Sequence, residues 1–336
     1  MVQPQKYGQI LSKISTMSQW GHHEKQKSTS LRRLKLVLAA AREVFTLKFG
    51  QFQLSVIREC TFKLDGGAMF GVVPKTLWSR VSPADTLNRV LLSCNLLLIE
   101  TPSGRLLVET GMGNRWAERD RERYEIKTLI DYTRVLAEVG LSNEDVDAVV
   151  ISHLHFDHAG GATVLMGNEL KPTFPKARYF VQKGEWEFAH SANARARASY
   201  RPDDFEPLLT SGVLTMMDGD TEIMPGIRAR VTGGHTRHHQ IVTFESESHK
   251  GCFFADILPT VSHLPPPWVM GYDHYPLASC DAKSQWLSKA ASEKWLVVFD
   301  HEPAVPWGSV ELGGEGRFNF LPLKTEPLVR DKVGAI

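Results

Sequence analysis

The sequence lacks any apolar run of the roughly 20 residues that a membrane-spanning helix needs. The most apolar early segment, "LKLVLAAAREVF", is short, is interrupted by charge, and lacks the ordered regions of a secretory signal. Cysteine is also scarce, and the four cysteines form no C-x-x-C pair and no disulfide-dense pattern. These absences predict a soluble protein of the cytoplasm whose thiols stay reduced.

An excess of one charge is missing as well. The 39 Lys and Arg residues against 38 Asp and Glu residues leave a net charge of +1. We therefore expect a small-molecule substrate as the partner, rather than nucleic acid or an anionic membrane. The sequence leaves the oligomeric state open, with a homodimer as one alternative. The chain of 336 residues, 42% of them hydrophobic, is long enough for a sizeable core.

Patterning divides the chain into three parts. Residues 1–44 are polar and basic and show no strand alternation, which predicts an N-terminal extension. Residues 45–305 form the expected domain, and residues 306–336 are expected to be a C-terminal tail that packs on it. Two β-like runs, "NLLLIE" and "RLLVET", flank the turn Thr101–Gly104 and predict a hairpin.

Elsewhere, short strands outnumber long helices. One helix is expected over Arg121–Val139, with Gly140 just past its end, and further helices near 183–198 and 278–294. The remaining expected strands are "FTLKFG", "FQLSVI", "DAVVIS", "ARYFVQ", "IRARVT", "IVTFES", "GCFFAD" and "WLVVFD". Because no regular strand–helix–strand series appears, we expect sheets packed on each other with helices outside.

Potential metal ligands are concentrated directly after the strand "DAVVIS". The motif H-x-H-x-D-H places His153, His155, Asp157 and His158 within six positions. Two histidines two residues apart can converge on one ion, and the Asp-His pair beyond the turn can face a second. Imidazole and carboxylate together suit zinc, iron and similar divalent metals. The spacing therefore predicts a metal site.

Three further donors follow other strands. His235 comes after a Gly-Gly turn, Asp256 follows "GCFFA", and His301 follows "WLVVFD". A carboxylate at the tip of an apolar strand is costly unless a cation or hydrogen bonds compensate it. Donors at the ends of several strands commonly gather at one edge of a sheet protein.

The combination of H-x-H-x-D-H, then G-H-T, then an Asp and a His at later strand ends resembles the metallo-β-lactamase-fold hydrolases. The resemblance runs from about Phe45 to Pro303. Segments such as "LDGGAMFGVVPKTLW" and "HLPPPWVMGYDHYP" resemble the bacterial branch that includes quorum-quenching N-acyl-homoserine lactonases. The resemblance implies an α/β fold, a four-layer αβ/βα sandwich of two mixed β-sheets with helices outside.

The resemblance also implies a dinuclear centre. One metal would be held by His153, His155 and His235, the other by Asp157, His158 and His301, with Asp256 bridging both. We expect two divalent ions, with Zn²⁺ as the leading candidate, although the same ligands accept iron, manganese or cobalt.

Two positions depart from the family pattern. Glu109 stands where the family usually has the Asp of a D-T-G turn that supports the ligands. The tyrosine that lactonases often carry shortly after the bridging aspartate is missing, and the nearest one is Tyr272 in the proline-rich loop.

The implied reaction is the opening of a lactone or ester by a metal-bridging hydroxide, with an N-acyl-homoserine lactone as the leading substrate. Asp157 is the candidate for passing a proton to the leaving alkoxide; a passive ligand role is its alternative. His263 and Tyr272 are candidates for hydrogen bonds to the substrate, with a loop-anchoring role as the alternative. Phe70, Trp78 and Trp268 could line an acyl pocket or simply pack in the core.

Other activities compete with this hypothesis. A phosphotriesterase, an arylesterase or a β-lactamase would use the same site. RNA processing is disfavoured by the balanced charge and by the position of the histidine motif. A redox di-iron centre usually has glutamate where His155 stands, and a non-catalytic role would be expected to lose a ligand.

Overall fold

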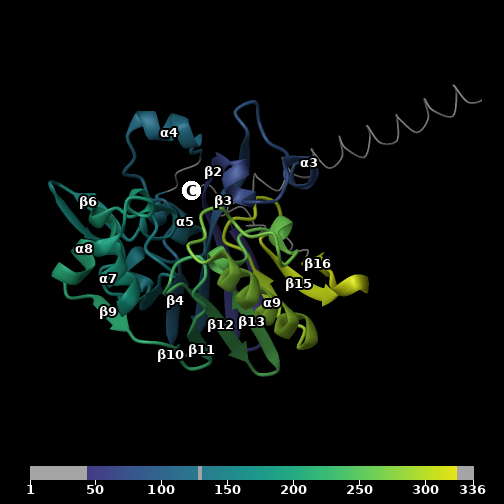
Figure 1. Ribbon diagram of the computed structural model, residues 1–336. Coiled ribbons are helices and arrows are strands. Elements are labelled where there is room, and N and C mark those ends of the chain that lie inside the picture. Colours follow the sequence, from purple (N-terminus) through teal and green to yellow (C-terminus); the bar gives the residue numbers. More distant parts are fainter. Residues whose placement is uncertain (1–43, 128–130, 324–336) are drawn as a thin grey trace, which may run out of the picture. The chain divides into compact units, whose positions relative to one another are not determined.

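Two seven-stranded sheets dominate the computed structural model, which describes residues 44–127 and 131–323 (Figure 1). The predicted N-terminal extension lies outside the described residues except for Val44, and so does the end of the predicted tail, residues 324–336.

The first sheet is mixed, with antiparallel pairing from β1 to β4 and parallel pairing from β4 to β9. Its spatial order is β1 (Val44–Phe49), β2 (Phe52–Asp65), β3 (Arg89–Thr101), β4 (Gly104–Val108), β5 (Ala148–Val150), β8 (Arg178–Gln182) and β9 (Leu214–Met217). The predicted hairpin is present, because Thr101 pairs with Gly104 where β3 turns into β4.

The second sheet is also mixed, since β13 and β14 run parallel within an otherwise antiparallel order. Its spatial order is β10 (Thr221–Met224), β11 (Ile227–Val231), β12 (Gln240–Ser246), β13 (His249–Phe253), β14 (Leu296–Val298), β15 (Trp307–Leu312) and β16 (Phe318–Pro322). Part of the predicted tail therefore forms a hairpin of this sheet. A small separate hairpin consists of β6 (Thr163–Met166) and β7 (Glu169–Pro172).

Within residues 44–127 and 131–323 the helices are short, apart from α9. They are α2 (Gly66–Phe70), α3 (Lys75–Trp78), α4 (Glu118–Tyr124), α5 (Tyr132–Glu138), α6 (Phe156–Ala159), α7 (Lys183–Ser191), α8 (Pro202–Thr210) and α9 (Pro276–Ser292). Single 3-10 turns occur at η2 (Asn143–Asp145), η3 (Arg197–Ser199), η4 (Ala255–Ile257), η5 (Val261–His263) and η6 (Gly314–Gly316).

The core is layered, because successive side chains along β3 point to opposite faces of the first sheet and join different apolar clusters. Leu97 and Ile99 face the second sheet and pack in one cluster with Val242 and Phe244. Leu96 and Leu98 point the other way and pack with Trp186 of α7 and residues of α5 and α8. On the far side of the second sheet, Leu287 and Ala290 of α9 pack on strand residues. Each fully buried large apolar side chain contributes about 1.5–3 kcal/mol. The result is the predicted order of helices, sheet, sheet and helix.

One predicted helix is wrong. The segment Arg121–Val139 does not form one helix: α4 ends at Tyr124 and α5 begins at Tyr132. Glu125 caps α4 in the left-handed conformation with φ of 44°, which ends the helix. Lys127 then pairs with Thr61 of β2 through backbone hydrogen bonds in both directions. The predicted helix near 183–198 likewise ends early, at Ser191.

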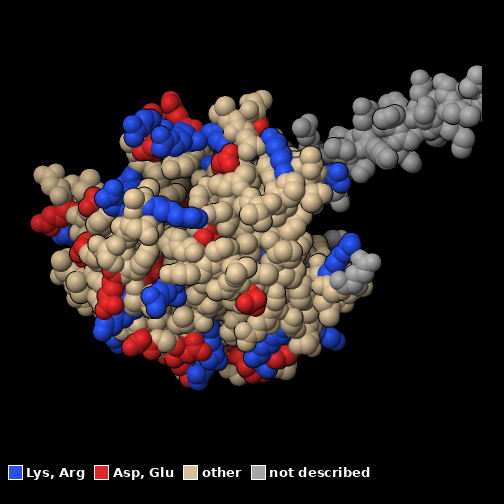
Figure 2. Space-filling model, in the orientation of Figure 1, with Lys and Arg blue, Asp and Glu red and all other residues tan. Residues whose placement is uncertain are grey.

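Surface charge follows the balanced composition. Lys and Arg side chains are interspersed with Asp and Glu on the face drawn in Figure 2, around a broad uncharged area. Among the described residues, no helix is long and apolar enough to cross a membrane.

Both sheets present strand ends to one edge. β4 and β5 run parallel in the first sheet, and β11, β13 and β14 share one direction in the second. Backbone hydrogen bonds join the sheets here: Ser93 of β3 donates to the carbonyl of His301, and Gln240 of β12 donates to that of Ser152. The residues that follow these strands therefore lie close together.

Candidate metal centre

The H-x-H-x-D-H motif lies on a tight connection from β5 into α6. His155 is the residue before the first turn of α6, so Asp157 and His158 belong to that turn. Gly161 lets this connection pack closely, because a Cβ there would overlap the carbonyl oxygen of Thr110. Only glycine allows such an approach. The sequence thus places four donors on one short, well-packed segment.

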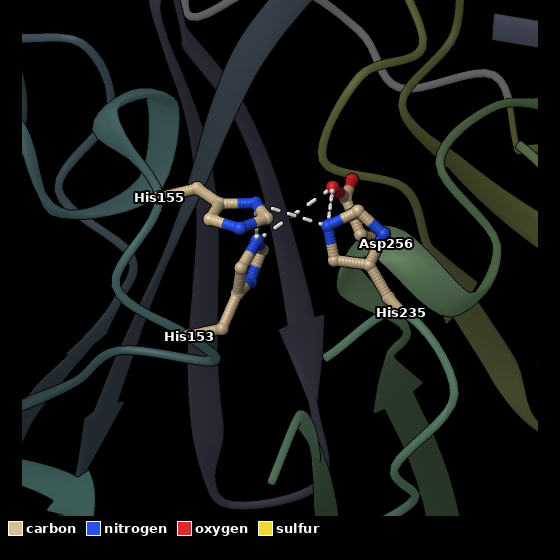
Figure 3. Close-up of side chains that lie close together, drawn as sticks. All are labelled: His153, His155, His235 and Asp256. Carbon is tan, nitrogen blue, oxygen red and sulfur yellow. Dashed lines mark hydrogen bonds and ion pairs between the residues drawn. The ribbon is translucent and has the colours of Figure 1, made fainter. Parts of the chain in front are cut away.

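The first donor group contains three imidazoles and one carboxylate (Figure 3). Nδ1 of His155 lies 2.9 Å from Nε2 of His153 and 3.1 Å from Nε2 of His235. Oδ2 of Asp256 lies 2.9 Å from Nε2 of His235 and 3.7 Å from Nε2 of His153. The four donor atoms thus point toward one another, although they come from three separate connections.

The second donor group contains His158, His301, Asp256 and Asp300, and Asp157 lies beside it. Nε2 of His301 lies 3.2 Å from Oδ1 of Asp256 and 3.6 Å from Oδ2 of Asp157. Nε2 of His158 lies 3.6 Å from Oδ2 of Asp256. Asp256 is therefore shared by both groups: its Oδ2 lies near imidazoles of both, and its Oδ1 lies near His301.

The donor atoms fit divalent cations. Nε2 of His158 and Oδ1 of Asp256 are buried and have no hydrogen-bond partner within the described part of the chain. Burying such atoms unpaired is costly, and a cation between them would compensate the carboxylates. Nitrogen and carboxylate oxygen are the ligands that zinc and related metals take in proteins.

The outer nitrogens of three histidines are held by other groups. Nδ1 of His301 donates to the carbonyl oxygen of Ser93 at 2.8 Å. Nδ1 of His235 lies 2.9 Å from Oδ1 of Asp273, and Nδ1 of His153 lies 2.9 Å from Oγ of Ser152. Such bonds fix the tautomer that turns the Nε2 lone pair toward the cluster, an arrangement typical of metal-binding histidines.

Burial controls the protonation of the first group. It lowers the pKa of His153 and His155 well below the usual range, and neighbouring imidazoles add to the effect, so both rings are neutral near pH 7. Burial also opposes protonation of His235, but the Asp256 and Asp273 carboxylates outweigh it and raise that pKa to about 10. A metal ion would have to displace this proton, because only the neutral ring binds.

Glu109 reaches the centre despite its extra methylene. Its Oε1 accepts the backbone N–H of Ser152 at 3.1 Å and lies 3.5 Å from Nδ1 of His158. Its backbone has φ of 68°, a conformation that side-chain-bearing residues rarely adopt. Glu109 therefore supports the connection after β5 and orients His158.

A cleft of about 260 Å³ opens over the two groups. Its floor includes His155, Asp157, His235, Asp256 and His301. Its walls include Tyr272, which is 37% exposed, together with Leu64, Met69, Tyr124, Phe156, Arg195, Met270 and His274. The cleft thus joins polar donors at the bottom to a partly apolar wall, as small-molecule sites commonly do.

His263 does not reach the cleft. Its Nε2 donates to the carbonyl oxygen of Met69 at 2.9 Å, and Oγ1 of Thr260 donates to its Nδ1 at 2.8 Å. The ring also stacks on Phe70 with centroids 4.6 Å apart. Since both nitrogens are engaged within the protein, the structure favours the alternative role of His263 as an anchor of its loop.

The aromatic residues proposed for an acyl pocket pack in the core instead. Phe70 and Trp78 are each 1% exposed and stack with centroids 5.2 Å apart, and Trp268 packs edge-on against Phe70. None of the three lines the cleft that the described residues form over the donor groups.

Three acidic residues at the centre escaped the sequence reasoning. Asp300 joins the second donor group, Asp273 holds His235, and Glu185 of α7 holds two of the connections. For Asp300 a signal existed, because it ends the apolar run "WLVVF" just as Asp256 ends "GCFFA". Asp273 and Glu185 stand in polar contexts that carry no such signal.

The fold and the paired donor groups define a β-sandwich protein with a candidate metal-binding site at the edge of its two sheets. Residues 89–301 match the metallo-beta-lactamase superfamily. The chain belongs to that superfamily, and the predicted fold is confirmed.

Individual relatives agree with this assignment. A metal-dependent hydrolase from Staphylococcus aureus, described as probable, has 30% identity and a TM-score of 0.76, covering 84% of this chain and 100% of its own. The dizinc quorum-quenching lactonase AidC, in complex with its product N-hexanoyl-L-homoserine, has 20% identity and a TM-score of 0.71. The match covers 84% of this chain and 98% of AidC. An N-acyl homoserine lactonase from Bacillus cereus is 29% identical over 179 residues, which span 50% of this chain and 64% of that protein.

Proposed function

We propose that the protein is a dinuclear metal-dependent hydrolase that opens a lactone or ester, with N-acyl-homoserine lactones as the leading substrate class. The observation that carries the proposal is the Asp256 carboxylate, shared by two donor groups at the floor of an accessible cleft. Similarity to the Bacillus cereus lactonase supports the substrate class.

In this proposal His153, His155 and His235 hold one divalent ion, and Asp157, His158 and His301 hold the other. Asp256, which belongs to both donor groups, would be shared by the two ions. When bound, such a pair of ions activates a water molecule and polarises the substrate carbonyl. Zn²⁺ is the leading candidate ion for the first group, whose donors are mainly imidazoles.

Residues of the chain then have distinct tasks. Asp157 lines the cleft and its Oδ2 lies 3.6 Å from Nε2 of His301, so it can move a proton from the reacting water to the leaving alkoxide. Tyr272 stands at the cleft wall and can donate its hydroxyl to a carbonyl oxygen of the substrate. Leu64, Met69 and Met270 offer apolar surface for an acyl chain.

One substrate panel tests the assignment. The purified protein, loaded with metal and assayed for metal content, would be given acyl-homoserine lactones of several chain lengths, γ-lactones, a paraoxon-type triester and a cephalosporin. The proposal expects the highest kcat/KM for a lactone. Turnover of the triester or the cephalosporin alone would assign the site to phosphotriester or β-lactam hydrolysis instead.

A further inference from the structure

Asp300 lies two residues past the carboxyl end of β14, immediately before His301. Its side chain is buried, with 2% of the residue exposed. Its backbone carbonyl accepts the N–H of Asn95 at 2.7 Å, which ties the connection to β3 of the first sheet. This backbone hydrogen bond thus fixes the position of the Asp300 main chain, and with it the place of the side chain.

The carboxylate faces the second donor group. Oδ2 of Asp300 lies 3.4 Å from Nε2 of His301 and 4.0 Å from Nε2 of His158. Around one ion with bonds of about 2.1 Å, ligand atoms lie about 3.0–3.4 Å apart when adjacent and about 4.2 Å apart when opposite. The first Asp300 distance matches the adjacent separation, and the second lies between the adjacent and the opposite separations.

The other pairs of donor atoms in that group have a similar spacing. The distances from Nε2 of His158 or His301 to the oxygens of Asp157 and Asp256 run from 3.2 to 3.8 Å. One ion could therefore contact two imidazoles and three carboxylates together.

Nothing else in the described chain satisfies the Asp300 carboxylate. Both of its oxygens are buried without a hydrogen-bond partner there. Its ion-pair contacts among the described residues are the rings of His158 and His301, the two imidazoles of the second group. A buried carboxylate in this setting is costly unless a cation compensates it.

The two groups consequently differ in chemistry. The first offers three nitrogens and one oxygen, whereas the second offers two nitrogens and up to three carboxylates. Imidazole suits zinc, while carboxylate suits manganese, which also takes more than four ligands readily.

We propose that Asp300 is an additional ligand of the second site and raises the ratio of Mn²⁺ to Zn²⁺ affinity there above that of the first site. This inference rests on the dinuclear centre of the proposed function and adds a carboxylate to its seven ligands. The centre is then an asymmetric one, with an imidazole-rich site and an oxygen-rich site.

The first test is a metal titration of the full chain without substrate. Apo-protein would be titrated with Mn²⁺, with free Mn²⁺ followed by electron paramagnetic resonance, and then with Zn²⁺, with bound metal measured by mass spectrometry. Asp300→Asn keeps the shape of the side chain and removes its charge. In Asp300→Asn we expect one of the two Mn²⁺ ions to bind at least tenfold more weakly than in the wild type. The affinity of the first site for Zn²⁺ should be unchanged.

Glu302→Gln is the matched control. Glu302 is also buried and two residues away, but its oxygens accept the backbone N–H groups of Val261 and Ala304. This variant should bind both Mn²⁺ ions as the wild type does. Mn²⁺ affinity of Asp300→Asn within twofold of the wild type would overturn the inference.

A second measurement uses the wild type alone, and so does not depend on whether the variant folds. Protein loaded with one Zn²⁺ and one Mn²⁺ per chain would be studied by X-ray absorption at the manganese edge. The inference expects outer-shell scattering from two imidazoles, and scattering from three would overturn it. Both experiments omit substrate, so a protein that binds two ions yet hydrolyses no lactone contradicts the proposed function without affecting this result.

Discussion

At the scale of the residue, the proposed dinuclear centre depends on Asp256, which belongs to both donor groups. Its carboxylate contacts both groups, since Oδ2 lies 2.9 Å from Nε2 of His235 and 3.6 Å from Nε2 of His158, and Oδ1 lies 3.2 Å from Nε2 of His301. Burial disfavours its charged form, yet His235, His158 and His301 hold the pKa of Asp256 well below its usual range. The residue is therefore a carboxylate at neutral pH and is available to two cations.

Replacing this carboxylate should disrupt both sites. For Asp256→Ala we expect fewer than two metal ions per chain after desalting and a loss of at least about 100-fold in hydrolysis rate. Asp220→Ala, which removes an exposed carboxylate paired with Arg230, is the control and should bind two ions. Full metal occupancy in Asp256→Ala, measured by mass spectrometry, would remove Asp256 from the ligands.

Tyr272 is the other residue whose role can be isolated. Removing its hydroxyl in Tyr272→Phe should lower kcat/KM for a lactone about tenfold, because one hydrogen bond to the substrate is lost, and should leave metal content unchanged. Tyr275→Phe is the matched control, since Tyr275 is exposed on the same loop and does not line the cleft. Equal kcat/KM in the two variants would show that the Tyr272 hydroxyl does not contact the substrate.

Spacing and position after strands pointed to the donors, and the resemblance implied their assignment to two ions. The seven residues that the resemblance implies as ligands do meet in space. His263 shows the limit, because the partners of its two nitrogens, Thr260 and the carbonyl of Met69, become visible only in the folded chain. Asp300 was missed although its context matches that of Asp256, since a ligand set taken from a resemblance has no place for an eighth donor.

At the scale of the element, α7 connects two metal-binding segments through Glu185. Its Oε1 accepts the N–H of Leu154 at 3.2 Å and the hydroxyl of Tyr200 at 2.9 Å. Its Oε2 accepts the hydroxyl of Thr236 at 2.6 Å, next to His235. Glu185 is thus a positioning residue that ties the connections after β5 and β11 together.

Removing this tie should loosen both connections at once. We expect Glu185→Ala to lower the free energy of unfolding by about 2–4 kcal/mol and to weaken metal binding, because three buried donors lose their acceptor. Glu185→Gln should retain most of the stability and most of the metal affinity, since an amide oxygen still accepts hydrogen bonds and the amide nitrogen can donate to Thr236. Glu187→Ala, on the exposed face of α7, is the control, and an equal effect from it would contradict the assigned role.

Sequence reasoning about elements was right where a strand was strongly apolar and wrong where polar contacts decided the boundary. The spacing of Leu129, Tyr132, Leu136 and Val139 favours one continuous helix. The left-handed Glu125 and the pairing of Lys127 with Thr61 end α4 instead. The strands β6, β7, β9 and β10 have four residues each, too few for a clear alternation.

At the scale of the whole molecule, both sheets contribute to the candidate metal centre. The motif after β5 belongs to the first sheet, whereas His235, Asp256 and His301 follow strands of the second. Bound ions would therefore link the sheets at one edge while the apolar cluster between them holds the rest. The sequence predicted this architecture because layered packing follows from strand patterning and from the family resemblance.

Linking the sheets should stabilise the fold. At a free metal concentration 100 times the Kd, binding adds about 2.7 kcal/mol, so chelation should lower Tm by about 5–10 °C. The comparison requires apo-protein and metal-loaded protein from one preparation, followed by circular dichroism. An unchanged Tm in protein shown to lose its metal would contradict the structural role of the centre.

The central claim is that a dinuclear metal site of this chain hydrolyses a lactone. The most direct measurement is the rate of N-acyl-homoserine lactone opening by one purified sample before chelation, after chelation and after adding back Zn²⁺, Co²⁺ or Mn²⁺. The account predicts that activity disappears with the metal and returns with it. Activity that resists complete removal of metal, or no lactone opening by protein that holds two ions per chain, would contradict it.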